Sequence, residues 1–195
     1  MALDVTCWSD LCCPWCWLGR DRTELLRGLG ATVTVRPYEL HPEIPASGRD
    51  VRPGGRLAAV FAGIERECVT LGRPFRAPDR VPNTNRALRT LEVVRAREAG
   101  AYDRLEDALY RAVWVDGLAV DDPDVLDRLT SGAGIPAPII RSAVDEGEGA
   151  AAVARSMADA HDAGVAGTPA WAFGEFVLPG VQPRPLYERI VAKLG

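Results

Sequence analysis

The chain has 195 residues, of which 47% are hydrophobic and 26% are charged, a composition typical of a globular protein with a substantial core. Its formal net charge is −4 and its basic residues are scattered, so no nucleic-acid or anionic-membrane partner is indicated. No apolar segment approaches the roughly 18 residues of a membrane span, and the first residues, MALDVTCW, lack the pattern of a secretory signal. We therefore expect a cytoplasmic protein.

The first 40 residues predict a strand, a helix and a second strand. Residues 2–8 are rich in strand-forming residues, and residues 13–30 then follow a helical pattern with Pro14 in the first turn. Residues 32–40, rich in Val and Thr, predict the second strand. Because the connections are short, the two strands should be parallel and joined by a right-handed crossover.

A long helical segment should follow a connecting loop at residues 41–56. Helical periodicity recurs over residues 57–71, 85–100, 101–117, 121–129, 139–147 and 148–164. In the fourth of these helices, Asp122 is the expected N-cap and Pro123 the first helical residue.

Strand patterns return near the C-terminal end. Residues 167–173 and 175–180 predict two strands around a turn at Gly174, and residues 185–195 predict a final helix. The order is βαβ, then helices, then ββα. It predicts an α/β domain made of residues 1–45 and 160–195, interrupted by an all-helical insertion at residues 46–159.

The five cysteines are the most informative residues. They are Cys7, Cys12, Cys13, Cys16 and Cys68. An odd number with four members clustered does not suit a secreted disulfide framework; in a reducing compartment such a cluster points to catalysis or metal binding.

Cys13 and Cys16 bracket Pro14 and Trp15 at the predicted start of a helix. Backbone N–H groups and the helix dipole at such a site stabilise a thiolate, whose pKa can fall from about 8.5 to roughly 3.5–7.5. Cys13 is therefore the candidate nucleophile, and Cys16, one turn further along, is the candidate resolving thiol. Pro14 and Trp15 should tune the redox poise. Trp15 brings no positive charge to the thiolate, as a histidine in its place could, which predicts a less strongly oxidising pair.

The segments SDLCCPWCWLG and GTPAWAF, with the helical block between them, resemble the DsbA family of the thioredoxin superfamily, in particular its FrnE-like cytosolic branch. The resemblance implies a thioredoxin fold and a protein dithiol–disulfide oxidoreductase or isomerase. It also implies that Pro169 is cis and faces the cysteine pair, with Thr168 binding an extended substrate. The substrate would be a protein or small molecule containing a disulfide, and no metal or cofactor is implied beyond the redox-active disulfide.

Three of the remaining polar positions near the motif leave alternatives open. Cys7 occupies about the place where many thioredoxin-like proteins carry a buried acid, and the strand pattern favours a core thiol there. Asp10 either replaces that acid as a proton relay or shapes the loop. Cys12 is either a spectator or a partner in a competing disulfide, although adjacent cysteines bridge poorly. Cys68 should be a core residue.

Two other functions stay open at this level. Relatives of the 2-hydroxychromene-2-carboxylate isomerase and kappa-class transferase type use the same fold with glutathione as co-substrate, usually with serine in place of Cys13. Alternatively, Cys7, Cys12, Cys13 and Cys16 would bind zinc or an iron–sulfur cluster, an interpretation that their spacing disfavours.

Overall fold

The computed structural model describes residues 2–195. The chain separates into two compact units, Met1–Leu40 with Ser156–Gly195, and His41–Arg155. The expected boundaries at residues 45 and 160 differ from these by a few residues. On the C-terminal side the division falls inside helix α7 (Ala150–Asp162), where an unbroken helical pattern offers no signal for a boundary.

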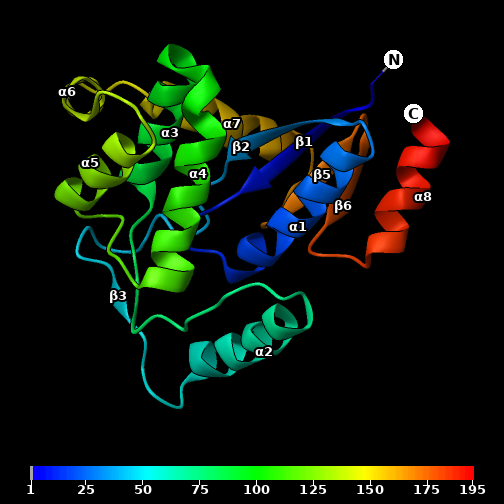
Figure 1. Ribbon diagram of the computed structural model, residues 1–195, viewed down its shortest axis with the longest axis horizontal. Helices are drawn as coiled ribbons and strands as arrows, with labels where there is room; N and C mark the ends of the chain where they lie inside the picture. The colour runs from blue at the N-terminus through cyan, green and yellow to red at the C-terminus, as the bar shows by residue number, and fades with distance from the viewer. Residues whose placement is uncertain (1) are drawn as a thin grey trace. The chain divides into compact units, whose positions relative to one another are not determined.

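The first unit contains a four-stranded mixed sheet in the order β2-β1-β5-β6 (Figure 1). Its elements are β1 (Asp4–Ser9), α1 (Pro14–Gly28), β2 (Thr32–Pro37), β5 (Ala170–Phe173), β6 (Phe176–Pro179) and α8 (Arg184–Leu194). Strands β1 and β2 are parallel as predicted, whereas β5 pairs antiparallel with β1 and β6 antiparallel with β5. This confirms the thioredoxin-type order βαβ…ββα.

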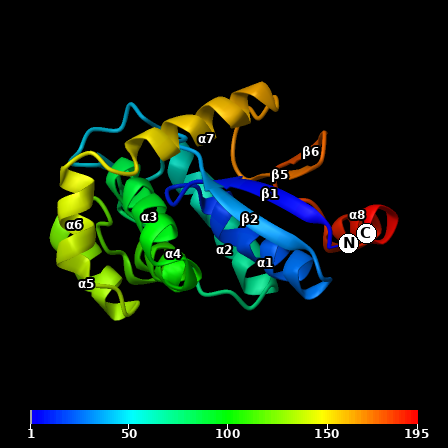
Figure 2. The same ribbon diagram turned by 90° about the horizontal axis from the view of Figure 1, so that it is seen from above.

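Both faces of this sheet are covered. Helices α1 and α8 lie on one face, and the C-terminal part of α7 lies on the other (Figure 2). Alternating side chains divide between the two sides, as the pleat of a strand requires. Cys7 and Trp171 belong to the first core, whereas Trp8 and Ala170 belong to the second, together with Ala160 of α7. The prediction that Cys7 is a core thiol is confirmed.

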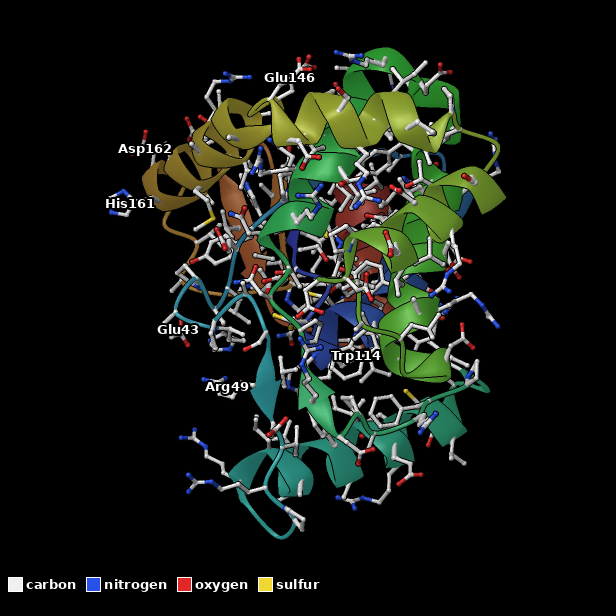
Figure 3. All side chains as sticks on the ribbon, turned by 90° about the vertical axis from the view of Figure 1, so that its left-hand side faces the viewer. Glu43, Arg49, Trp114, Glu146, His161 and Asp162 are labelled. Atoms are coloured by element: carbon white, nitrogen blue, oxygen red, sulfur yellow. The ribbon has the colours of Figure 1, made fainter. Side chains whose placement is uncertain are left out.

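The second unit is mainly helical. It contains β3 (Arg49–Asp50), α2 (Arg56–Thr70), β4 (Arg80–Val81), α3 (Asn85–Arg97), η1 (Ala99–Ala101), α4 (Tyr102–Arg111), the π-helical turn η2 (Ala112–Asp116), α5 (Pro123–Gly132), α6 (Ala137–Asp145) and the first turns of α7. Helices α3, α4, α5 and α6 pack against one another. Trp114, labelled in Figure 3, belongs to this unit. Its side chain is fully buried and stacks on Phe75.

One sequence expectation for this unit needs correction. Residues 41–56 were expected to form only a loop in an all-helical insertion, but Arg49 and Asp50 pair with Val81 and Arg80 in a two-residue antiparallel ladder. Two residues are too few to show strand periodicity, and the partner strand lies about thirty positions away, so no local sequence pattern predicts the pairing. By contrast, Asp122 caps α5 as predicted, accepting a hydrogen bond from the Asp124 N–H at 2.8 Å.

Within residues 2–195, no helix combines the length and the apolar character needed to cross a membrane.

Candidate active site

The cysteine pair lies where β1 gives way to α1. Cys13 is the N-cap of α1 and Pro14 is its first residue, where the missing N–H costs no hydrogen bond. The Cys13 carbonyl accepts hydrogen bonds from the N–H groups of Cys16 and Trp17 at 3.0 and 3.3 Å. The Cys13 N–H in turn donates to the carbonyl of Asp10 at 3.2 Å. The nucleophile predicted from the sequence therefore sits at a well-formed helix N-terminus.

The two thiols have opposite electrostatic surroundings. Both are free and almost completely buried, with exposures of 2% for Cys13 and 1% for Cys16. Hydrogen bonding from the Cys16 side chain, assisted by the Cys16 N–H, lowers the pKa of Cys13 against the effect of burial. Burial in turn raises the pKa of Cys16 well above its usual value, and proximity to Cys13 adds to that shift. A thiolate therefore forms first at Cys13.

The Thr168–Pro169 segment, which lies near the C-terminal end of the sequence, faces the cysteine pair in the fold. The peptide bond between Thr168 and Pro169 is cis. The Cys13 thiol donates to the carbonyl oxygen of Thr168 at 3.3 Å, although the two residues are 155 positions apart. The structure thus brings together Cys13, Cys16 and Thr168, which the sequence placed in separate motifs.

A pocket of about 500 Å³ opens beside this segment. Its lining comprises Gly164, Val165, Ala166, Gly167, Thr168, Pro169, Ala170, Val177, Pro179 and Gly180. None of these residues carries a charge, and most contribute small apolar side chains or bare backbone. Such a surface is suited to an uncharged, extended segment whose main chain supplies the polar contacts.

Trp15 differs from the cysteines of the motif because the residue is 43% exposed. The residue belongs to the first turn of α1, between the buried Cys13 and Cys16. An exposed ring at this position offers apolar contact area to a bound molecule and lends the thiolate no positive charge.

Asp10 is fully buried at the carboxyl end of β1. Its Oδ2 accepts hydrogen bonds from the Leu40 N–H at 2.7 Å and from the Cys12 thiol at 3.3 Å. Its Oδ1 accepts a longer one from the Cys12 N–H at 3.4 Å. Through these bonds Asp10 shapes the loop, which is one of the two roles that the sequence left open for it. They also show that the Cys12 thiol contacts Asp10. A role for Asp10 as proton relay stays a prediction.

Two residues near the site carry no clear signal in the sequence. A hydrogen bond with the Ser9 side chain lowers the pKa of Cys16, against the larger effect of burial. Gly19 of α1 lies so close to the opposing loop that a Cβ placed there would meet Trp171 at 3.0 Å and Pro169 at 3.1 Å. The only sequence signal for Gly19 is a glycine inside a helical pattern, which indicates a close approach by another segment but does not say which segment approaches.

The other cysteines do not assemble around the pair as a metal site. In the part of the chain that the structure describes, no three His, Cys, Asp or Glu side chains are grouped so as to hold a metal ion. Cys68 is buried in α2 of the other unit, as predicted, and burial raises its pKa to about 11. A thiol with such a pKa is a poor nucleophile at neutral pH.

Comparisons with known proteins agree with this geometry. A probable DsbA oxidoreductase from Streptomyces coelicolor is 25% identical, with a TM-score of 0.87 over 98% of this chain and 89% of that one. A 2-hydroxychromene-2-carboxylate isomerase is 17% identical, with a TM-score of 0.78 over 98% and 96% of the two chains. The cytosolic disulfide reductase DsbM from Pseudomonas aeruginosa is 17% identical, with a TM-score of 0.71 over 98% of each chain. The last two likenesses concern the fold alone.

The strongest assignment comes from a family model. The model of the DSBA-like thioredoxin domain matches residues 4–192, a span that includes the cysteine pair, the helical insertion and the Thr168–Pro169 segment. The chain therefore belongs to the family of DSBA-like thioredoxin domains.

Proposed function

We propose that this protein is a thiol–disulfide oxidoreductase that cycles a Cys13–Cys16 disulfide. The observation that carries the proposal is the unequal pair of thiols at the start of α1. The pKa of Cys13 is lowered by hydrogen bonding from Cys16, whereas burial raises the pKa of Cys16. A low-pKa attacking thiol beside a buried, protonated second thiol is what disulfide exchange requires.

In the reducing direction, the Cys13 thiolate attacks one sulfur of a substrate disulfide. A bond forms between Cys13 and that sulfur, and the other substrate sulfur leaves as a thiolate and takes up a proton. Cys16 then loses its proton and attacks the Cys13 sulfur, which releases the second substrate thiol. The substrate gains two electrons, the protein becomes the Cys13–Cys16 disulfide, and the oxidising direction is the reverse.

The surface beside the thiols supports a peptide as substrate. The pocket at Thr168 and Pro169 is uncharged, and Trp15 exposes an apolar ring next to the pair. An extended peptide is recognised mainly through its main chain, and an uncharged surface does not select for charged side chains on the peptide. A cytoplasmic location, expected from the sequence, is part of the proposal, and one fold neighbour is described as a cytosolic disulfide reductase.

A glutathione-dependent reaction on a small molecule is the second candidate. The likeness in fold to a 2-hydroxychromene-2-carboxylate isomerase favours it, as does a DsbM structure with GSH at a TM-score of 0.70. Such an enzyme would activate the glutathione thiol without cycling its own disulfide. Its activity would therefore survive Cys16→Ser, whereas disulfide exchange would stop at the mixed disulfide.

The test is to equilibrate the protein in glutathione buffers of graded potential and to count trapped thiols. We expect wild type and Cys68→Ala to lose two thiols together, and Cys13→Ser and Cys16→Ser to form no intramolecular disulfide of this pair. A midpoint near about −270 mV would indicate a thioredoxin-like reductant, and one near about −120 to −180 mV an oxidant or isomerase. If wild type forms no such disulfide in any buffer, the proposal is wrong.

A further inference from the structure

Asp10 is a buried acidic residue three positions before Cys13, and the cycle above does not use it. The residue is 0% exposed and lies in a loop of only four residues between β1 and α1. A carboxyl group is seldom kept there without hydrogen bonds, because burying it unpaired is costly. The Asp10 carboxyl group accepts such bonds from two directions. The Cys12 thiol and N–H donate from its own loop, and the Leu40 N–H donates from the segment after β2.

The Leu40 bond ties the cysteine loop to the segment that follows β2. Tyr38 continues the β1–β2 ladder by donating to the carbonyl of Ser9 at 3.0 Å, and the Asp10 bond to Leu40 follows directly. On the other side, the Asp10 carbonyl accepts the Cys13 N–H. Asp10 therefore links the ends of two parallel strands to the N-cap of α1. A change at Asp10 should reach the position of Cys13 directly through that hydrogen bond.

The hydrogen bonds to the Asp10 side chain also indicate its charge. Leu40 N–H, Cys12 N–H and Cys12 S–H are all donors, and a carboxylate accepts such bonds at both oxygens. Asp10 shares a four-residue loop with Cys13, and its negative charge raises the pKa of the Cys13 thiol, which must itself become negative. At short range and away from water, two like charges oppose each other strongly.

We propose that Asp10 is a positioning residue that anchors the Cys13 loop and, through its charge, limits how strongly the Cys13–Cys16 pair oxidises its substrates. Cys12 takes part by donating its thiol proton to the carboxylate, which gives this unusual neighbour of Cys13 a role other than a competing disulfide. The inference rests on the proposed oxidoreductase function.

The physical reason is the balance between the two redox forms. Only the dithiol form carries a thiolate at Cys13, so a nearby negative charge destabilises that form and leaves the disulfide unaffected. The charge of Asp10 opposes the lowering of the Cys13 pKa that Cys16 produces. A less stable dithiol means a weaker oxidant. The groups that hydrogen-bond with the Cys13 thiol, Cys16 and Thr168, do not carry a fixed charge.

Asp10→Asn is the informative substitution because it removes the charge and keeps the anchor. The amide oxygen can replace Oδ2 and accept from Leu40 and the Cys12 thiol, so that only the long hydrogen bond from the Cys12 N–H is broken. Asp162→Asn is the matched control, since it removes the same charge from a side chain that is 83% exposed at the end of α7 (Figure 3). Cys12→Ser supplies a second background that keeps a donor to Asp10 and removes the competing thiol.

Two quantities are measured for each protein: the pH dependence of Cys13 alkylation and the equilibrium constant with glutathione. For Asp10→Asn we expect the alkylation profile to move to lower pH. We expect the equilibrium to shift toward the dithiol by at least threefold, about 14 mV for a two-electron couple. Both shifts should recur in the Cys12→Ser background, and Asp162→Asn should match wild type.

An Asp10→Asn protein that folds and matches wild type in both quantities, or moves either one the other way, overturns the inference while leaving the proposed function intact. If instead wild type and every variant fail to form the Cys13–Cys16 disulfide, it is the proposed function that fails. Asp10→Ala, which removes anchor and charge together, separates the two effects. It should lose stability where Asp10→Asn does not.

Discussion

At the scale of single residues, the site works through differences between side chains that look equivalent in the sequence. Cys12, Cys13 and Cys16 lie within five positions, yet each sulfur has a different partner. Cys12 donates to Asp10, Cys13 to the carbonyl of Thr168, and Cys16 interacts with Cys13 and Ser9. These partners, and not the identity of the residues, distinguish the three thiols and underlie the roles of anchor, nucleophile and resolving group that we propose for Cys12, Cys13 and Cys16.

Trp15, between the two cysteines of the motif, offers a test of the prediction that an uncharged residue there makes the pair less strongly oxidising. Trp15→His should make the protein a stronger oxidant at pH 6, because a protonated imidazole stabilises the adjacent thiolate. A shift of about tenfold toward the dithiol, about 30 mV, is the expected size in glutathione buffers. The shift should shrink at pH 8, where the ring is neutral. Trp15→Phe, which keeps an aromatic ring without a charge, should match wild type; equal potentials for the two variants would contradict the argument.

At the scale of elements, the close approach of α1 to the loop before β5 holds the two halves of the site together. Gly19 allows this approach because its missing side chain leaves room for Pro169 and Trp171. Trp171 is fully buried and packs edge-on against Tyr187 of α8, so its ring has little freedom to move aside. The spacing between the cysteines and Thr168 therefore depends on a glycine one turn beyond the motif.

Gly19→Ala should destabilise the protein by about 1 kcal/mol. Overpacking a tight interior costs about 1–3 kcal/mol, and the better helix propensity of alanine returns at most about 1 kcal/mol. Urea denaturation with an unchanged m-value would measure it. Gly28→Ala is the matched control in the same helix, because a Cβ there meets nothing within 4 Å. That variant should be neutral or slightly more stable. A stabilised Gly19→Ala protein would show that the loop yields easily.

At the scale of the whole molecule, the titration of Cys13 links the redox site to folding stability. In the unfolded chain the thiol has its ordinary pKa, and in the folded dithiol form this pKa is lowered, chiefly by hydrogen bonding from Cys16. A group with a lowered folded pKa stabilises the folded state at high pH. That stabilisation is lost as pH falls through the folded pKa.

We therefore expect the dithiol protein to gain stability relative to Cys13→Ala as pH rises toward 9. The comparison is confined to pH values below 9, because above it the unfolded chain also ionises Cys16, whose folded pKa is raised by burial. Denaturation curves of both proteins at several pH values under reducing conditions provide the measurement. A difference in unfolding free energy that stays constant between pH 5 and pH 8.5 would contradict a lowered pKa at Cys13.

Local patterns were enough to predict much of this protein. Each strand and helix of the βαβ and ββα segments follows from alternation or helical periodicity over a few neighbouring residues, and so does the cap at Asp122. The place of Cys13 at a helix start follows from Pro14 and from the apolar helix pattern behind it. The core position of Cys7 follows from the strand alternation. These features depend on residues close together in the chain, whose spacing the sequence states directly.

What the tertiary structure alone decided are the contacts between distant segments. Three of these contacts join residues that no short sequence pattern relates. They are the hydrogen bond from the Cys13 thiol to the Thr168 carbonyl, the hydrogen bond from the Leu40 N–H to Asp10, and the close packing of Gly19 against Pro169 and Trp171. The two-residue ladder of β3 and β4 belongs with them. Each arises because folding brings strand ends and loops to one place. The sequence by itself determined which residues are candidates for the chemistry, because they lie in one short motif, and the fold determined which atoms surround each sulfur.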